Sequence, residues 1–214
     1  NDGTEKNGTK DDGTQNNGVT DSRAEHDEES QNGDENGGSE ASAPEIIEIG
    51  TSGDFLDFVK SCSLDSWSSD KQVVLTADID LSGMIFDPVP IFTGAFNGQN
   101  HTISGFRYGG DGYVAGLFRY IGKDGLVENR KLEGEIISAD EKECIGSLCG
   151  VNYGTIKNCS FQGTVSGKTT VGGLVGVNDG TGMIRNSSVT GRVTGYYSTG
   201  GIAGRNHGTI SYSI

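Results

Sequence analysis

The sequence predicts an all-β protein: a parallel β-helix, or solenoid, with a short N-terminal capping helix and a disordered acidic tail. The first observation is a repeated motif, VGGLVGVNDG at 171–180, which recurs as IGSLCGVNYG at 145–154 and TGGIAGRNHG at 199–208. One apolar position within it recurs every 26 to 31 residues, at Leu117, Leu148, Leu174 and Ile202. A period of that size is typical of stacked repeat architectures. The second observation is composition, with 36 glycines, 3 prolines and only 32% hydrophobic residues.

Residues 1–45 are predicted to be a disordered acidic spacer. They hold 13 acidic and 3 basic side chains, a net charge of −10 out of −14 for the whole chain. They contain no aromatic residue, so they cannot bury enough apolar surface to offset chain entropy. Gly3, Gly8, Gly13 and Gly18 lie five apart, which is typical of a low-complexity spacer. No spacing there copies a known calcium loop.

Residues 46–214 are predicted to be the folded part, beginning with a cap at 46–70. Residues 46–49 form a short strand in this interpretation, and Thr51 to Asp54 supply helix N-cap chemistry. The apolar residues that follow, 55–59, have helical spacing, and the helix should end near Lys60. Such a helix can cover the open end of a solenoid, which needs end caps. A ligand-binding helix is the alternative.

The first coils are predicted at 71–110. Val73 to Leu81 is interpreted as one strand, followed by a turn at Ser82 and Gly83. After Pro88 and Pro90, the stretch FTGAFNGQNHTISGF at 92–106 contains short β runs separated by glycine turns.

Residues 111–214 are predicted to be repeats of two parts. The first part is the glycine-rich strand that runs into an asparagine turn. The second begins with another asparagine and then alternates apolar and glycine residues in steps of two, as in Leu132, Gly134 and Ile136. Alternation at period two is strand periodicity, and like strands of successive coils then stack ~4.8 Å apart. Antiparallel hairpins would not need to repeat the sequence, so each unit is interpreted as one coil of a parallel β-helix.

Asparagines at matching positions are predicted to form ladders from coil to coil. One set precedes the alternating strands, and the other closes the glycine-rich strands: Asn129, Asn158 and Asn186; Asn152, Asn178 and Asn206. Asparagine suits such corners because it tolerates positive φ. Asn100, Asn158 and Asn186 also match the N-glycosylation pattern. If Asn158 and Asn186 stack inside turns, we interpret those matches as accidental.

The four cysteines indicate no metal site. No CxxC pair occurs among the cysteines, and no histidine lies at zinc-ligand spacing from them. The four are Cys62, Cys144, Cys149 and Cys159. Cys149 takes the place of Phe118, Val175 and Ala203 in other copies, which predicts an interior hydrophobic role. A disulfide between Cys144 and Cys159 is left open.

The segments GSLCGVNYGTIKNCSFQGTV, GGLVGVNDGTGMIRNSSVTGRV and GGIAGRNHGTI resemble the GLUG motif of secreted and surface bacterial proteins, including some immunoglobulin A peptidases. The upstream stretches LTADIDLSG and FTGAFNGQNHTISGF are similar to the region that often precedes these repeats. The resemblance covers about residues 72–214. It implies an extracellular right-handed β-helix and no activity, since the zinc-protease chemistry of those peptidases lies in a separate domain. An accessory domain of a larger secreted peptidase is therefore one alternative.

Enzymatic activity is not expected. A zinc protease needs His-Glu-x-x-His, whereas His26 lies in the tail and His101 and His207 lie in turns. The other alternative is a polysaccharide lyase or hydrolase, which needs clustered carboxylates. The candidates are Asp78 and Asp80, which could share one face of a strand and converge on a cation. We instead expect both acids to be solvated or bonded to turn backbone, and we expect no cofactor.

The favoured hypothesis is a non-catalytic stalk or adhesion scaffold on a bacterial surface or in secreted form. Its outward polar residues, such as Thr164, Thr190 and Arg192, could contact host glycans or proteins, or further domains of the same chain. Nucleic acid is not expected, because no positive surface forms, and no segment has the ~18 apolar residues of a membrane span. Asn1 is not an initiator methionine and Ile214 falls partway through a repeat, which predicts a processed or truncated chain.

Overall fold

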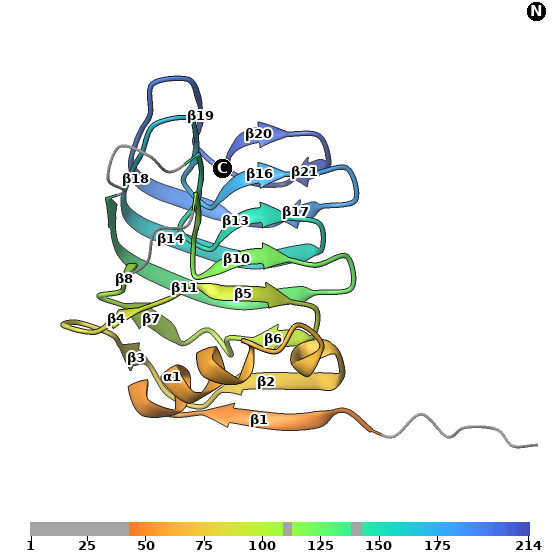
Figure 1. Cartoon of the computed structure of the whole chain (residues 1–214). Coiled ribbons are helices and arrows are strands. Elements are labelled where there is room, and N and C mark those ends of the chain that lie inside the picture. Colours follow the sequence, from red (N-terminus) through yellow and green to blue (C-terminus); the bar gives the residue numbers. More distant parts are fainter. Residues whose placement is uncertain (1–42, 109–112, 138–142) are drawn as a thin grey trace, which may run out of the picture. The chain divides into compact units, whose positions relative to one another are not determined.

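The computed structural model describes residues 43–108, 113–137 and 143–214. These residues form a parallel β-solenoid of about six turns with one short α-helix (Figure 1). The predicted fold class is therefore confirmed. The predicted disordered spacer lies, except for residues 43–45, outside the described residues. No helix in the described part of the chain is long and apolar enough to cross a membrane.

A ten-stranded sheet forms two adjoining sides of the solenoid, and all its strand pairs are parallel. One side contains β1 (Glu45–Ile49), β2 (Lys71–Leu75), β6 (Ala95–Asn97), β11 (Leu126–Ile137), β14 (Thr155–Ser166), β17 (Met183–Arg185) and β21 (Thr209–Ser211). The other contains β3 (Ile79–Asp80), β7 (Thr102–Ser104), the second halves of β11 and β14, and β18 (Ser188–Thr194). The long strands β11 and β14 pass from one side to the other, so each contributes to both.

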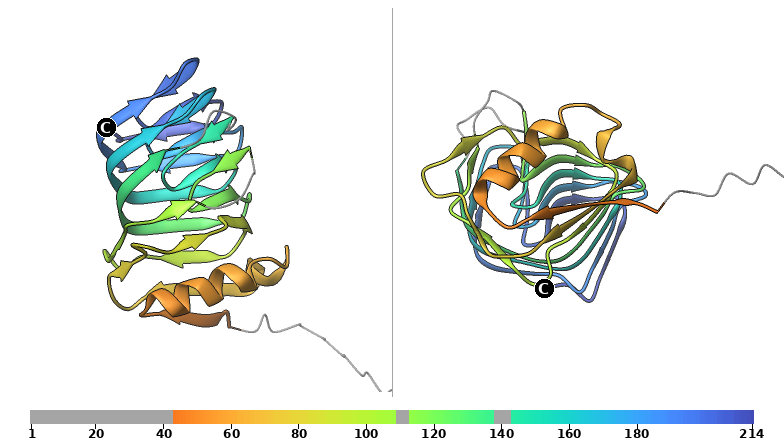
Figure 2. Two further views of the ribbon diagram at one scale, coloured as in Figure 1. Left: turned by 60° about the vertical axis from the view of Figure 1, so that its left-hand side comes forward. Right: turned by 90° about the horizontal axis from the view of Figure 1, so that it is seen from below.

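Three smaller parallel sheets complete the coils. The five-stranded sheet contains β5 (Val89–Phe92), β10 (Phe118–Ile121), β13 (Cys149–Asn152), β16 (Val175–Asn178) and β20 (Ala203–Asn206). The four-stranded sheet contains β9 (Val114–Ala115), β12 (Cys144–Ile145), β15 (Thr170–Gly172) and β19 (Ser198–Gly200). A two-stranded sheet pairs β4 (Ile85–Phe86) with β8 (Arg107–Tyr108). Like strands of successive coils therefore stack along the axis, as Figure 2 shows from the side.

The glycine-rich motif turns one apolar side chain per coil into the core. Leu117, Leu148 and Leu174 are fully buried, whereas Ile202 in the last copy is half-buried. Leu148 N donates to Leu174 O at 3.0 Å, and Leu174 N donates to Ile202 O at the same distance. Leu174 lies in the bend just before β16, so both it and the adjacent Val175 reach the interior. A flat strand would have sent these two neighbours to opposite faces.

The N-terminal end of the core is closed by an aromatic cluster beneath helix α1 (Ser52–Ser61). Figure 2 shows α1 lying across that end of the solenoid. The ring of Phe58 lies 6.0 Å from Phe92 and 5.6 Å from Phe96, and Phe92 lies 5.2 Å from Phe118. Phe55 and Phe58 are buried. Burying two phenylalanines stabilises the cap by roughly 1.5–3 kcal/mol each.

The structure differs from the expected strand at 73–81. That stretch is broken into β2 and β3, with Thr76 to Asp78 forming the connection. The reason is topological: β2 pairs with β6 on one side of the large sheet, whereas β3 pairs with β7 on the other. The chain must bend between them. A short 3₁₀-helix at Trp67–Asp70 was also not predicted from the sequence.

Replacing Thr51 with alanine should lower the free energy of unfolding by about 1 kcal/mol. Thr51 and Asp54 form a capping box, in which Asp54 N donates to Thr51 Oγ1 (3.1 Å) and Thr51 N donates to Asp54 Oδ2 (2.9 Å). Urea denaturation followed by the fluorescence of Trp67 measures the loss. Thr51→Ser keeps the hydroxyl and is the matched control. Equal stability of the two variants would contradict the capping role.

Candidate binding surface

The outward side of β3, β7, β11, β14 and β18 presents a continuous polar surface, called the polar face below. Leu132 and Ile136 of β11 point into the core, so Glu133 and Glu135 point out. Register pairing stacks further polar side chains beside them. Two outward columns result: Asp80, Ser104, Glu133, Gln162 and Thr190; Glu135, Thr164 and Arg192.

A column of glycines runs between these two polar columns. Gly134, Gly163 and Gly191 pair in register and have φ values of 157°, 150° and 139°. A Cβ built on Gly163 would overlap the carbonyl oxygen of Gly134, and one on Gly191 would overlap that of Gly163. Only glycine therefore allows the strands to bend here at this spacing. Because each glycine lies between two outward residues of an alternating strand, the strip between the two polar columns carries backbone alone.

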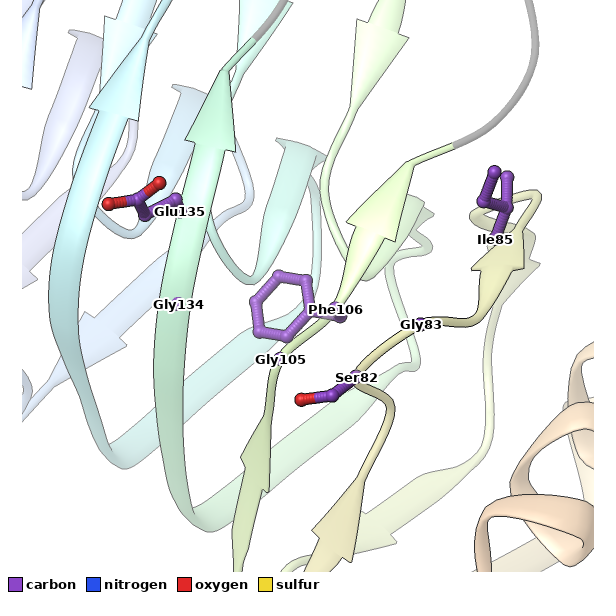
Figure 3. Close-up of a pocket in the computed structure, with 7 residues that line it drawn as sticks. All are labelled: Ser82, Gly83, Ile85, Gly105, Phe106, Gly134 and Glu135. Atoms are coloured by element: carbon purple, nitrogen blue, oxygen red, sulfur yellow. The ribbon is translucent and has the colours of Figure 1, made fainter.

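Two hollows lie on the glycine column. The first has a volume of about 550 Å³ and is lined by Ser82, Gly83, Ile85, Gly105, Phe106, Gly134 and Glu135. Figure 3 shows the ring of Phe106, which lies in the connection between β7 and β8, pointing toward Gly134, with Ile85 on the opposite side. The second has a volume of about 760 Å³ and is lined by Gln162, Gly163, Thr164, Thr190, Gly191, Arg192 and Val193. Both volumes lie in the range of small-ligand sites.

Sequence reasoning identified the glycine column but not the hollows. The first hollow joins residues near 82–85, 105–106 and 134–135, which come from three successive coils. The recurrence of glycine every 28 or 29 residues from Gly105 to Gly191 was the available signal. It marks where side chains are missing, although it gives no information on depth.

Asp78 and Asp80 are both exposed, and each accepts a hydrogen bond from a backbone N–H group. Asp78 Oδ1 accepts from Thr102 N at 2.8 Å and lies 3.2 Å from His101 Nδ1. Asp80 Oδ1 accepts from Ser82 N at 2.9 Å. The bond from Thr102 N is the main reason that the pKa of Asp78 lies below its ordinary value, and hydrogen bonding to Ser82 lowers that of Asp80. Both groups are thus ionised acceptors at neutral pH, which does not suit a general acid.

The two acids flank the buried Ile79, and each carboxylate accepts a backbone hydrogen bond. Asp80 belongs to β3, whereas Asp78 lies in the connection before it. Within the ranges that the structure describes, no three His, Cys, Asp or Glu side chains group closely enough to hold a metal ion. The polar face offers hydrogen-bond donors and acceptors along a shallow trough, which follows the glycine column.

The outer asparagine ladder lies on the surface, at the bend between the two halves of the large sheet. Asn158 Nδ2 donates to Asn129 Oδ1 at 3.0 Å, and Asn186 Nδ2 donates to Asn158 Oδ1 at 3.4 Å. All three residues have positive φ, between 49° and 53°. Asn129 Nδ2 also donates to Asn97 Oδ1 at 3.3 Å, so the ladder has a fourth member that the sequence pattern did not reveal.

The inner asparagine ladder is buried inside the turns of the five-stranded sheet. Asn152 Nδ2 donates to Asn178 Oδ1 at 2.8 Å, and Asn178 Nδ2 donates to Asn206 Oδ1 at 2.7 Å. Asn152 and Asn178 are fully buried, whereas Asn206 is exposed. The two ladders tie successive coils together through side chains as well as through backbone.

All four cysteines are free thiols, so the structure contains no disulfide between Cys144 and Cys159. Cys149 is fully buried in the column of Phe118, Val175 and Ala203, as an interior hydrophobe would be. Burial raises the pKa of the Cys159 thiol to about 12 and also raises the pKa of the Cys149 thiol. Neither is therefore a reactive thiolate at neutral pH.

The fold and the polar face define a class: a repeat module built as a parallel β-solenoid. Within it, residues 143–166 and 167–194 match the family described as the GLUG motif, so this part of the chain is a GLUG-motif repeat region. The chain is similar to "Halomucin" of Haloquadratum walsbyi, with 34% identity in an alignment of 124 residues that covers 49% of this chain. It is also similar to "Putative Gly-rich membrane protein" of Evansella cellulosilytica, with 39% identity in an alignment of 98 residues that covers 43% of this chain.

The similarity covers only small parts of those two relatives. It spans 1% of the first protein and 11% of the second. No solved structure matches the chain significantly.

Proposed function

We propose that this chain is a non-catalytic extracellular scaffold of a surface or secreted protein and that its polar face binds glycans. The observation that carries the proposal is the trough along the glycine column. There, polar side chains that include Gln162, Thr164 and Arg192 flank a strip without side chains. Hydroxyl, amide and guanidinium groups are hydrogen-bonding partners suited to sugar hydroxyls.

The other features of the chain support a scaffold rather than a catalyst. The acids that were candidates for catalysis have lowered pKa values and accept hydrogen bonds from backbone N–H groups. A solenoid whose coils stack through two asparagine ladders is a stiff spacer. The names "Halomucin" and "Putative Gly-rich membrane protein" of the relatives support a surface location.

A glycan array, followed by mucin pull-down with the whole chain, tests the proposal. We expect binding that falls at least tenfold, or about 1.4 kcal/mol, in the double variant Gln162→Ala/Arg192→Ala. The matched control is Arg185→Ala, because Arg185 is exposed on β17, on the other side of the large sheet. If the array and the pull-down detect no glycan, the adhesion role is wrong and a stalk role remains. If both variants lose binding equally, attraction through charge alone explains it.

A further inference from the structure

A pocket separate from the polar face lies between helix α1 and the segment that joins β4 to β5; we call it the cap pocket. Its volume is about 520 Å³, within the range of small-molecule sites. Leu56 and Val59 line it from the helix, and Pro88 and Pro90 line it from the other side. Arg119 of β10 adds a guanidinium group to the lining.

The apolar part of the cap pocket is pre-formed. Pro88 and Pro90 are two of only three prolines in the chain, and the fixed φ of proline makes that wall rigid. Val59 is held by the core beneath it. Ile85, at the rim, is 75% exposed, which is unusual for a side chain of its size beside a pocket. An apolar group in the pocket would remove some of this surface from water.

The terminal edge of the Arg119 guanidinium, made of Nη1 and Nη2, is the part that a ligand can reach. Nε is buried, whereas the side chain as a whole is 31% exposed. Nη2 lies 4.0 Å from Asp87 Oδ1, which is too long for a hydrogen bond. Nη1 and Nη2 together form a planar fork that matches a carboxylate bidentately. This edge is therefore suited to an incoming anion.

Neighbouring charges leave that edge available. The Asp87 side chain is 70% exposed, and a contact of 4.0 Å with so exposed an acid contributes little. Lys60 also lines the pocket, and its Nζ is paired with Asp57 at 3.0 Å. Asp87 is thus the one carboxylate in the pocket lining that could compete for Arg119.

We propose that the cap pocket binds a carboxylate attached to a small apolar body. The carboxylate takes the Nη1–Nη2 edge of Arg119, and the apolar body packs between Leu56, Val59 and the two prolines. A free aliphatic acid and the C-terminal residue of a peptide share this chemistry. The site goes beyond the glycan-binding role and does not depend on it.

Titrations of the ¹⁵N-labelled chain, followed by NMR, test the proposal with four probes. Hexanoate represents the free acid and N-acetyl-leucine the peptide terminus, whereas hexanol and hexylammonium carry similar bodies without a carboxylate. We expect at least one carboxylate to bind tenfold or more tightly than hexanol and hexylammonium, and to shift the Arg119 Nε–H signal. Whichever acid binds more tightly indicates the source of the natural ligand.

Three variants complete the experiment. Arg119→Gln should weaken binding of the carboxylate at least tenfold while leaving hexanol binding unchanged, and Asp87→Asn should strengthen it by removing the competing acid. The control Arg192→Gln, which removes an exposed arginine of the polar face, should change nothing. Hexanol binding as tightly as hexanoate would overturn the proposal. So would an unchanged affinity in Arg119→Gln, or no carboxylate binding at about 10 mM, where even a ~−3 kcal/mol interaction is visible.

Discussion

Replacing Arg130 with methionine should raise the free energy of unfolding by about 1–4 kcal/mol. Arg130 is the largest fully buried side chain, with 1% of its surface exposed. None of its three guanidinium nitrogens has a hydrogen-bond partner within the described residues. It makes a cation–π interaction, with Cζ 4.1 Å from the centroid of Phe96. Such a contact contributes up to about 2 kcal/mol and does not offset the burial of an unpaired charge.

The stacked coils show why methionine should fit. Register pairing places Cys159 at this position in the next coil, and Ser187 follows it. Small side chains therefore occupy the position elsewhere, and the arginine is the exception. Methionine is flexible and of similar length, so it can fill the same space beside Phe96 without a charge.

The pH dependence gives a second measurement of the same effect. Burial lowers the pKa of Arg130 from its ordinary value to about 9. Above pH 9 the folded protein therefore binds fewer protons than the unfolded chain, and its free energy of unfolding rises with pH. The full free-energy cost of burying the charged guanidinium of Arg130 is present at neutral pH. The stability difference between wild type and Arg130→Met should consequently narrow as the pH rises from 8 toward about 10.

Thermal and urea denaturation measure both effects. Arg192→Met is the control, since Arg192 is exposed and its replacement should change stability by no more than about 0.5 kcal/mol. A less stable Arg130→Met variant would contradict the interpretation and would indicate that the cation–π contact dominates.

Arg130 also illustrates what the sequence could not predict. The recurring asparagines marked the bend at Asn129, and the alternation from Leu132 marked the strand after it. The position directly after the bend, that of Arg130, has no common chemical character among the copies. Arginine, cysteine and serine occupy it. Its inward direction follows from the positive φ of Asn129, 53°. A period-two pattern contains no information on such a bend.

The sequence did not predict the candidate sites, and the reason is related. Leu117, Leu148 and Leu174 could be aligned because the motif around them repeats. The first hollow and the cap pocket are instead built partly by the coils at 71–110, where Ile85 has no counterpart in a recognisable motif. Arg119 stands where the later copies have a glycine: Gly150, Gly176 and Gly204. The positions of the two sites depend on coil length and register, which are fixed only when the coils stack.

Replacing Asn178 with alanine should lower the free energy of unfolding by about 2–4 kcal/mol, because several buried partners lose their bonds together. Asn178 accepts from Asn152 Nδ2 at 2.8 Å and donates to Asn206 Oδ1 at 2.7 Å and to Gly182 O at 3.2 Å. It is fully buried, so water does not replace these bonds in the intact coil. Asn178→Asp should be destabilising too, since an oxygen would then face Gly182 O and Asn206 Oδ1.

The matched control comes from the outer ladder. Asn186→Gly keeps a residue that tolerates positive φ and removes one exposed bond of 3.4 Å, so it should cost no more than about 1 kcal/mol. Equal losses in Asn178→Ala and Asn186→Gly would show that burial of the inner ladder adds no stability.

The position of Asn178 also determines which probe should detect the change. Each coil of a solenoid contacts only its neighbours. Removing the hydrogen bonds of Asn178 should therefore destabilise first the coils between Asn152 and Asn206. Trp67 packs against Phe58 beneath the cap, far along the stack from this ladder. We therefore expect hydrogen exchange in β13, β16 and β20 to accelerate before Trp67 fluorescence changes. Simultaneous changes at both ends would instead demonstrate that the coils unfold as one cooperative unit, with the ladders transmitting stability along the axis.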